Sequence, residues 1–219
     1  PLPEQTKIAN FLTAVDEKIS GLKKKKELLE QYKKSVMQQI FSQQLRFKDD
    51  NGEDFADWEE KKLGEILTIG SGKDYKHLEN GEVPVFGTGG YMTSVNDWLY
   101  DGETVCIGRK GTIDKPMYYK GKIWTVDTLF YSHKFVDCSP KFIYYVFQGI
   151  NWKEYNEASG VPSLSKSTIE KICINIPSLP EQTKIANFLS AIDEKIRFCG
   201  KEIEGMESWK KGLLQQMFV

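Results

Sequence analysis

Residue types that perform catalysis occur in this sequence, but their spacing does not form a complete catalytic motif. Residues 163–166 (SLSK) have the S-x-x-K spacing of serine acyl-enzymes without the companion motifs of that class. Residues 71–73 (SGK) look like part of a phosphate-binding loop, but Asp74 follows where that loop needs Ser or Thr. Residues 59–61 (EEK) match half of a nuclease metal site and lie in an acidic run, which favours plain surface charge. We therefore expect no catalytic residue in this chain.

The histidines and cysteines do not predict a metal site. His77 and His133 have no metal-ligand spacing to each other or to a cysteine. The four cysteines are 32, 35 and 26 residues apart, which fits neither a CxxC pattern nor a disulfide scaffold, and they are Cys106, Cys138, Cys173 and Cys199. We expect a reducing, cytoplasmic location, because the sequence also shows no secretion signal and no apolar run long enough to span a membrane.

Several glycine-containing loops carry side chains that suit contact with nucleic acid. Residues 108–111 (GRKG) place two cations at a loop tip that can approach another backbone closely. Residues 73–76 (KDYK), 87–91 (GTGGY) and 163–167 (SLSKS) add lysines, hydroxyls and aromatic rings. Arginine suits guanine edges, while lysine, serine and threonine suit phosphates. From spacing alone, ordinary turn chemistry is at least as good an interpretation of each loop.

The net charge does not favour a nucleic-acid binder until it is divided along the chain. The 219 residues contain 30 Lys+Arg and 31 Asp+Glu, a formal net charge of −1, with an ordinary 40% of hydrophobic residues. Residues 1–48 carry +5, residues 49–178 carry −6 and residues 179–219 are neutral. The acids concentrate at residues 49–65, whereas residues 105–135 carry +4. The sequence thus predicts a locally cationic surface around the GRKG loop.

The elements that must position these loops begin with one long internal repeat. Residues 2–12 and 179–189 both read LPEQTKIANFL, and the match continues without a gap to Phe41 and Phe218. Of the 40 aligned pairs, 24 are identical, which indicates a duplication. Since there are two copies, 177 residues apart, a solenoid is excluded and the copies bracket a different segment.

Each copy of the repeat predicts a long helix with a coiled-coil seam. Mostly apolar residues recur at alternating spacings of four and three, a 3.5-residue period that persists for about five heptads. A helix that long needs a partner of equal length, and the other copy is the obvious one, so we predict an antiparallel coiled coil. The predicted seam residues are Ile8, Leu12, Val15, Ile19, Leu22, Leu29, Val36, Ile40, Ile185, Leu189, Ile192, Ile196, Ile203, Met206, Leu213 and Met217.

The segment between the repeats predicts a separate mixed domain, so the expected fold class is α+β. Residues 49–65 predict a solvated acidic linker, and residues 140–157 look like one amphipathic helix or two short ones. Short β-like runs separated by Gly-rich turns predict strands at residues 65–69, 83–86, 104–107, 116–119, 123–126, 129–135 and 171–176. We place the boundaries at residues 1–46 for the first helix, 47–178 for the mixed domain and 179–219 for the second helix.

The duplicated helix LPEQTKIANFL[ST]A[VI]DEKI resembles the conserved repeats of the DNA-specificity subunits of type I restriction-modification systems. The segment between the repeats resembles one target recognition domain of that family, through the stretches TIGSGKDY, PVFGTGGYM, CIGRKGTIDKP, WTVDTLFY and GVPSLSKSTIEKICINIPSLPEQ. Family members usually carry two recognition domains, each followed by such a helix. This chain has one recognition domain between a central and a distal repeat, so it resembles a half-subunit.

The resemblance implies a non-catalytic subunit that recognises double-stranded DNA and reads one half of a bipartite site. Its helices would dock methyltransferase subunits and, through them, the restriction subunit. S-adenosylmethionine, ATP and magnesium would be bound by those partners, so we expect no cofactor in this chain. Two associated chains would present two recognition domains to a two-fold-symmetric interrupted site, which makes a homodimer a further hypothesis.

Under this resemblance, the polar loops become candidate DNA contacts. Arg109 and Lys110 are the first candidates, and the others, placed by loop chemistry, are Lys73, Tyr75, Lys76, Thr88, Tyr91, Lys115, Ser165 and Lys166. Two other interpretations stay open. One is a coiled-coil protein-interaction adaptor without DNA binding, and the other is a nuclease that uses the acidic loop at Glu59.

Overall fold

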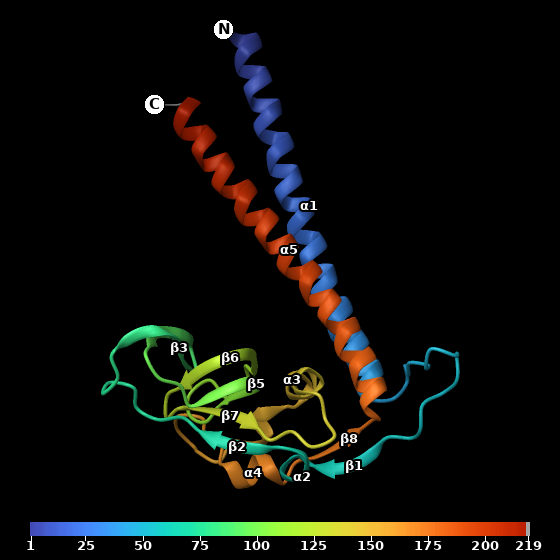
Figure 1. Cartoon of the computed structure of the whole chain (residues 1–219). Coiled ribbons are helices and arrows are strands. Elements are labelled where there is room, and N and C mark those ends of the chain that lie inside the picture. Colours follow the sequence, from blue (N-terminus) through green and yellow to red (C-terminus); the bar gives the residue numbers. More distant parts are fainter. Residues whose placement is uncertain (218–219) are drawn as a thin grey trace. The chain divides into compact units, whose positions relative to one another are not determined.

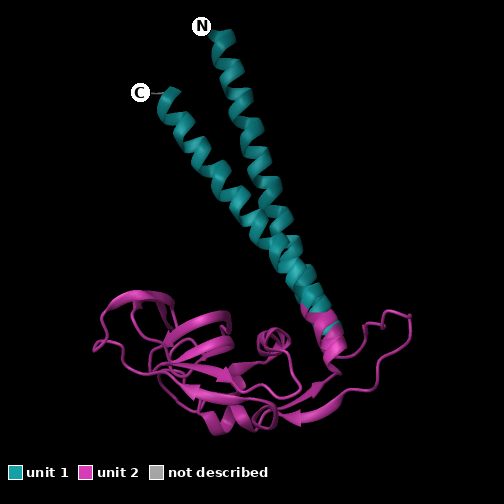
Figure 2. Cartoon of the chain, in the orientation of Figure 1, with its two compact units in different colours: residues 1–39, 187–219 teal, residues 40–186 magenta. Residues whose placement is uncertain are grey.

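A computed structural model describes residues 1–217 and shows two compact units. The helical unit contains residues 1–39 together with the described residues from Asn187 onward, and the sheet unit contains residues 40–186 (Figure 2). The predicted α+β fold class, with a sheet domain and two long helices, is confirmed. Within residues 1–217, no helix is long and apolar enough to cross a membrane.

The two copies of the repeat form the two long helices, α1 (Leu2–Phe41) and α5 (Leu179–Met217) (Figure 1). In the helical unit they run antiparallel, because residue numbers fall along one helix as they rise along the other. Lys23 Nζ lies 2.6 Å from Glu207 Oε1, and the rings of Phe11 and Trp209 meet at a centroid distance of 5.9 Å. Leu22 of α1 and Cys199 and Ile203 of α5 form a buried apolar cluster in the same unit.

Burial along the predicted seam decreases toward the ends of the chain. The fully buried members are Val15, Ile19, Leu22, Val36, Ile40, Ile185, Leu189, Ile192 and Ile203, and the half-buried members are Ile8, Leu12, Leu29, Ile196, Met206, Leu213 and Met217. Burial of the seam is most complete at Ile40, Ile185 and Leu189, which are 0% exposed, and less complete toward the start of α1 and the end of α5, where the two helices diverge (Figure 1).

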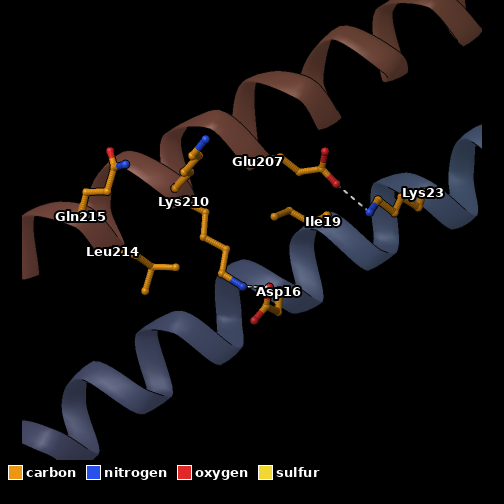
Figure 3. A pocket seen from close by; sticks show the side chains of 8 residues that line it. Asp16, Ile19, Lys23, Glu207, Lys210, Leu214 and Gln215 are labelled. Atoms are coloured by element: carbon orange, nitrogen blue, oxygen red, sulfur yellow. Dashed lines mark hydrogen bonds and ion pairs between the residues drawn. The ribbon is translucent and has the colours of Figure 1, made fainter. Parts of the chain in front are cut away.

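A cleft of about 840 Å³ opens between α1 and α5 in the helical unit (Figure 3). Its apolar floor includes Ile19 and Leu214, and its rim includes Lys23, Glu207 and Lys210. Two ion pairs between the helices border the cleft. One joins Lys23 to Glu207, and the other joins Lys210 to Asp16. The two helices separate at this cleft, but the ion pairs between their side chains remain.

The sheet unit is built on a six-stranded sheet with the strand order β2-β7-β5-β6-β3-β4. Neighbouring strands are antiparallel, except that β3 and β6 run parallel. The strands are β2 (Thr68–Ser71), β3 (Asn80–Gly87), β4 (Gly90–Val95), β5 (Tyr100–Gly108), β6 (Met117–Thr125) and β7 (Leu129–His133). A separate two-stranded sheet pairs β1 (Glu59–Lys62) with β8 (Cys173–Ile176), so the beginning and the end of the domain meet.

Short helices complete the core of the sheet unit. Helix α3 (Pro140–Gly149) contacts β5 and β6 and buries Phe142, Ile143 and Phe147 completely. The 3₁₀-helix Trp152–Tyr155 follows it, and the Trp152 indole donates to the carbonyl of Phe147 at 2.8 Å. The remaining helices, α2 (Leu63–Ile66) and α4 (Lys166–Glu170), contact each other.

A buried carboxylate ties the entry segment to the start of α5. Glu181 is fully buried, and it accepts hydrogen bonds from Arg46 Nη2 at 2.9 Å and from the Trp58 indole at 3.1 Å. Arg46 also donates to the carbonyls of Phe55 and Ala56, at 3.2 and 2.7 Å. The bond to Glu181 is the main reason that the pKa of Arg46 is raised. This cluster fixes the acidic segment at one end of the sheet unit.

The structure differs from the sequence-based expectations at several places in the sheet unit. The acidic linker contains a paired strand, because the backbone of β1 bonds to β8 while its charged side chains stay largely exposed. Strand β4 begins at the end of the expected glycine-rich turn and continues through residues for which no strand was expected. The two strands expected at residues 116–119 and 123–126 are replaced by the single strand β6 (Met117–Thr125), since Gly121 at φ +120° continues the chain opposite Gly102.

Candidate nucleic-acid interface

A groove of about 820 Å³ crosses the sheet unit where several segments far apart in the sequence meet. Three cations, two carboxylates and several hydroxyls lie among apolar side chains in its lining. The lining residues are Ser71, Arg109, Lys110, Asp127, Thr128, Phe130, Glu157, Ala158, Val161, Ser163, Leu164, Ser165 and Lys166. The groove therefore combines the charged and polar groups that contact DNA with apolar surface that can pack against bases.

Two glycines shape the GRKG loop that carries Arg109 and Lys110. A Cβ on Gly108 would lie 2.0 Å from the carbonyl oxygen of Thr112, so a side chain does not fit there. Gly111 has φ +96°, which side chains rarely adopt. The loop is thus a tight reversal that presents both cations at its tip, and both are exposed.

Backbone hydrogen bonds join the GRKG loop to the serine-rich segment. Gly111 N donates to Pro162 O at 2.8 Å, and Leu164 N donates to Arg109 O at 2.9 Å. Lys110 and Ser163 form an antiparallel β-bridge between these two bonds. Because the two segments are tied at three successive positions, Ser165 and Lys166 are held beside the GRKG loop.

The backbone of β7 and the turn before it hold Arg109 from the other side. The amides of Arg109 and Lys110 donate to Thr128 O at 2.8 and 3.2 Å. The guanidinium donates to Asp127 O at 3.4 Å and lies 5.9 Å from the centroid of the Phe130 ring. Its remaining N–H groups face solvent, and a bidentate contact to a guanine edge needs two of them.

The three groove cations are not neutralised within the described part of the chain. No carboxylate of residues 1–217 lies within 4.0 Å of the charged nitrogens of Arg109, Lys110 or Lys166. The local positive charge expected for this region is therefore available to an external anion.

Glu157 is held in the groove by the segment that carries Ser165 and Thr168. Its Oε1 accepts hydrogen bonds from Ser165 Oγ at 2.7 Å, from Ser165 N at 3.3 Å and from the hydroxyl of Thr168. The bond from Thr168 is the largest cause, and the bond from Ser165 the next, of a pKa for Glu157 below the usual carboxyl value. Its amide also donates to Ser163 O at 3.0 Å. Glu157 therefore orients the segment that carries Ser165 and Lys166.

The structure brings four of the ten predicted DNA contacts together in the groove, namely Arg109, Lys110, Ser165 and Lys166. Thr88 lies next to the GRKG loop, since its hydroxyl is 3.6 Å from the position of a Cβ on Gly111. The other five do not line the groove, and they are Lys73, Tyr75, Lys76, Tyr91 and Lys115.

The five residues outside the groove have different surroundings. Tyr75 packs against the core cluster around Val83 and Trp124, and the carbonyl of Lys73 accepts the Trp124 indole at 2.9 Å. Tyr91 is 63% exposed on β4, with its hydroxyl 3.1 Å from Ser94 Oγ. Lys76 and Lys115 are exposed. Sequence reasoning missed Glu157, because it fell inside the helix expected over 140–157.

The acidic residue considered for a nuclease site lies on strand β1. Glu59 forms an ion pair with Lys61 at 3.0 Å, and this contact is the main cause of a raised pKa at Lys61. Within residues 1–217, no group of three or more His, Cys, Asp or Glu side chains is arranged to hold a metal ion.

Comparison with known families identifies the chain. Residues 56–208, well over half of the sequence, match the model of the family described as "Type I restriction modification DNA specificity domain". The chain belongs to this family, so the resemblance inferred from the sequence is confirmed.

Individual relatives agree with this assignment. The type I restriction enzyme MjaVIII specificity subunit of Methanocaldococcus jannaschii is 27% identical, over 98% of this chain and 59% of that protein. The type I restriction enzyme EcoDI specificity subunit of Escherichia coli is 28% identical, over 63% of this chain and 31% of that protein. The chain thus spans about three fifths, or less, of the length of these curated relatives.

Solved structures show the same fold. The S subunit of a type I restriction-modification system from M. genitalium superposes with a TM-score of 0.74 at 22% identity, over 99% of this chain and 61% of that one. The HsdS subunit from Thermoanaerobacter tengcongensis gives a TM-score of 0.58 at 16% identity, over 100% of this chain and 59% of that one. These solved structures therefore share the fold of this chain, with a sheet domain that lies between two long helices in the sequence.

Proposed function

We propose that this chain is a non-catalytic specificity subunit that acts in the cytoplasm and reads one half of a bipartite DNA site. The observation that carries the proposal is the groove of the sheet unit, where the exposed Arg109 and Lys110 and the half-buried Lys166 have no ion pair within residues 1–217. A domain of the DNA specificity family that presents unpaired cations and hydroxyls in one groove has the chemistry to read a duplex.

The groove residues have separate tasks in this proposal. The backbone of Arg109 is held on both sides, so its guanidinium extends from a fixed position in the groove and can meet guanine O6 and N7. Lys110, Lys166 and Ser165 suit phosphate oxygens and set the register of the domain on the duplex. The apolar members of the lining, such as Val161, exclude water and can contact a thymine methyl group.

The helical unit would dock the methyltransferase subunits. Several large apolar side chains on α1 and α5 are exposed, among them Leu28, Tyr32 and Phe198, which are 51%, 51% and 63% exposed. Exposed apolar surface of this kind marks protein interaction sites, and the cleft beside Ile19 adds a concave feature. S-adenosylmethionine, ATP and magnesium would belong to the methyltransferase and restriction subunits, the latter joined through the former.

Two copies of the chain would recognise two half-sites. One recognition domain reads one half of an interrupted site, so a homodimer would read a two-fold-symmetric sequence. Light scattering over a range of concentrations tests this part of the proposal. A mass of two chains is expected, and a strict monomer at every concentration would contradict it.

Co-purification and methylation mapping test the function as a whole. The full chain, tagged and expressed in its own host, is expected to retain methyltransferase subunits, and adenine methylation should map to one interrupted sequence motif. Deleting the chain should abolish methylation of that motif. Recovery of the chain without any methyltransferase, together with an unchanged methylation pattern on deletion, would contradict the proposal.

A further inference from the structure

The groove is not a uniformly cationic channel. Beside its three cations it contains the carboxylates of Asp127 and Glu157. A surface that only holds the DNA backbone gains nothing from carboxylates, because they repel phosphates. A carboxylate in a DNA-reading groove needs another partner, and the exocyclic amino groups of cytosine and adenine are the donors that base edges offer in the major groove.

Glu157 is the better placed of the two carboxylates for such a contact. All three donors to its side chain bind Oε1, so the carboxylate is held in one orientation before DNA arrives. No donor within residues 1–217 reaches its second oxygen, Oε2, and the side chain is exposed in the groove. A pre-oriented carboxylate with one free oxygen is a fixed acceptor for an incoming N–H group.

The distance from Glu157 to Arg109 is limited by hydrogen-bonded backbone. Glu157 N bonds to Ser163 O, and the next residue, Leu164, bonds through its amide to Arg109 O. The two side chains therefore come from neighbouring segments of one wall of the groove. Since base pairs stack at about 3.4 Å, the side chains of Glu157 and Arg109 can contact base pairs that are about three or fewer steps apart.

We propose that Glu157 is a specificity-determining residue that accepts a hydrogen bond from the amino group of a cytosine or an adenine, close to the base pair read by Arg109. The inference rests on the proposed function, because it assumes that the groove meets base edges. Glu157 also discourages non-specific binding, since its charge repels a phosphate backbone that enters the groove out of register.

Selection from a random DNA pool tests this assignment. The full chain, with the methyltransferase subunits that co-purify with it, is used as wild type, as Glu157→Gln and as Arg109→Ala, and the bound DNA is sequenced. Gln keeps an oxygen for Ser165 and Thr168 but replaces the free acceptor by an amide donor. We expect Glu157→Gln to lower the preference at one base pair by roughly 5- to 10-fold, within about three base pairs of the position relaxed by Arg109→Ala.

Glu154→Gln is the matched control, because it removes one charge from the same segment but lies outside the groove lining. It should leave the selected motif unchanged. A wild-type motif that Glu157→Gln leaves intact at every position would overturn the inference while preserving the proposed function. If the wild-type chain enriches no sequence, the proposed function fails and the inference fails with it. A uniform loss at all positions with a lowered melting temperature would assign Glu157 a purely structural role.

Discussion

The helical unit and the groove of the sheet unit use charged side chains in opposite ways. In the helical unit, lysines of one helix pair with carboxylates of the other, as Lys23 does with Glu207. In the groove, Arg109, Lys110 and Lys166 have no carboxylate partner within residues 1–217. Paired charges fix the register of two segments within the chain, whereas unpaired charges remain available to a ligand.

This comparison separates stability from recognition. Substitutions in the seam of the helical unit should change the free energy of unfolding and leave the DNA contacts of the groove intact. Substitutions of the groove cations Arg109 and Lys110 should do the reverse, because these side chains are exposed and contribute little internal packing.

The largest expected effect is on stability, from Leu189→Ala in the seam. Leu189 is fully buried, and truncating a buried leucine removes apolar contacts and leaves a cavity. We expect a loss of about 3 kcal/mol in the free energy of unfolding, measured by denaturant titration with far-UV circular dichroism. DNA affinity of the folded protein should stay within a factor of about two. A loss below about 1 kcal/mol would show that the seam is not closely packed at this position.

Arg109→Ala should give the largest effect on recognition. If the guanidinium is bidentate to a guanine, its removal weakens binding of the specific site by about 1–3 kcal/mol and relaxes the preference for that base. The melting temperature should be unchanged, because the side chain is exposed. Competition binding at fixed salt measures both affinities. Equal affinities of wild type and variant for the specific site would remove Arg109 from the readout.

Lys110→Ala should have a smaller and less selective effect. A phosphate contact carries no sequence information, so affinity should fall about equally for specific and non-specific DNA. The slope of log K against log salt should decrease by about one. A change in base preference with an unchanged salt slope would instead place Lys110 against a base edge.

Lys23→Ala should have the smallest effect. Its ion pair with Glu207 is solvent-exposed on both sides, and such pairs contribute less than about 1 kcal/mol. We expect a stability change below about 0.5 kcal/mol and no change in DNA binding, by the same two assays. A loss above about 1 kcal/mol would show that this ion pair contributes more than a solvent-exposed pair does.

The helical unit was the more predictable half of the molecule. A seam with a 3.5-residue period, repeated in two copies, defines both helices and their antiparallel partner without any tertiary information. The structure buries Val15, Leu22 and Ile192 as the period implies. The divergence of the helices toward Leu12 and Leu213 was not predictable, because the same apolar pattern continues there.

The groove was less predictable, because tertiary backbone contacts assemble it. The GRKG loop could be identified by its residue types, but its hydrogen bonds to Pro162 and Leu164 join segments more than 50 residues apart in sequence. Glu157 was hidden in an apparently amphipathic run. Helix α3 ends at Gly149, and the 3₁₀-helix Trp152–Tyr155 then redirects the chain so that Glu157 enters the groove.

The salt dependence of DNA binding by the full chain tests the central claim most directly. Filter binding with the selected DNA site, titrated with KCl, should show log K falling linearly with log salt, as expected when Lys and Arg displace counterions from phosphates. The selected site should remain preferred over scrambled DNA at each salt concentration, and Arg109→Ala should lower that preference by about 1–3 kcal/mol. Absence of any DNA binding at low salt, by a chain that still binds methyltransferase subunits, would contradict the account and favour a protein-interaction adaptor.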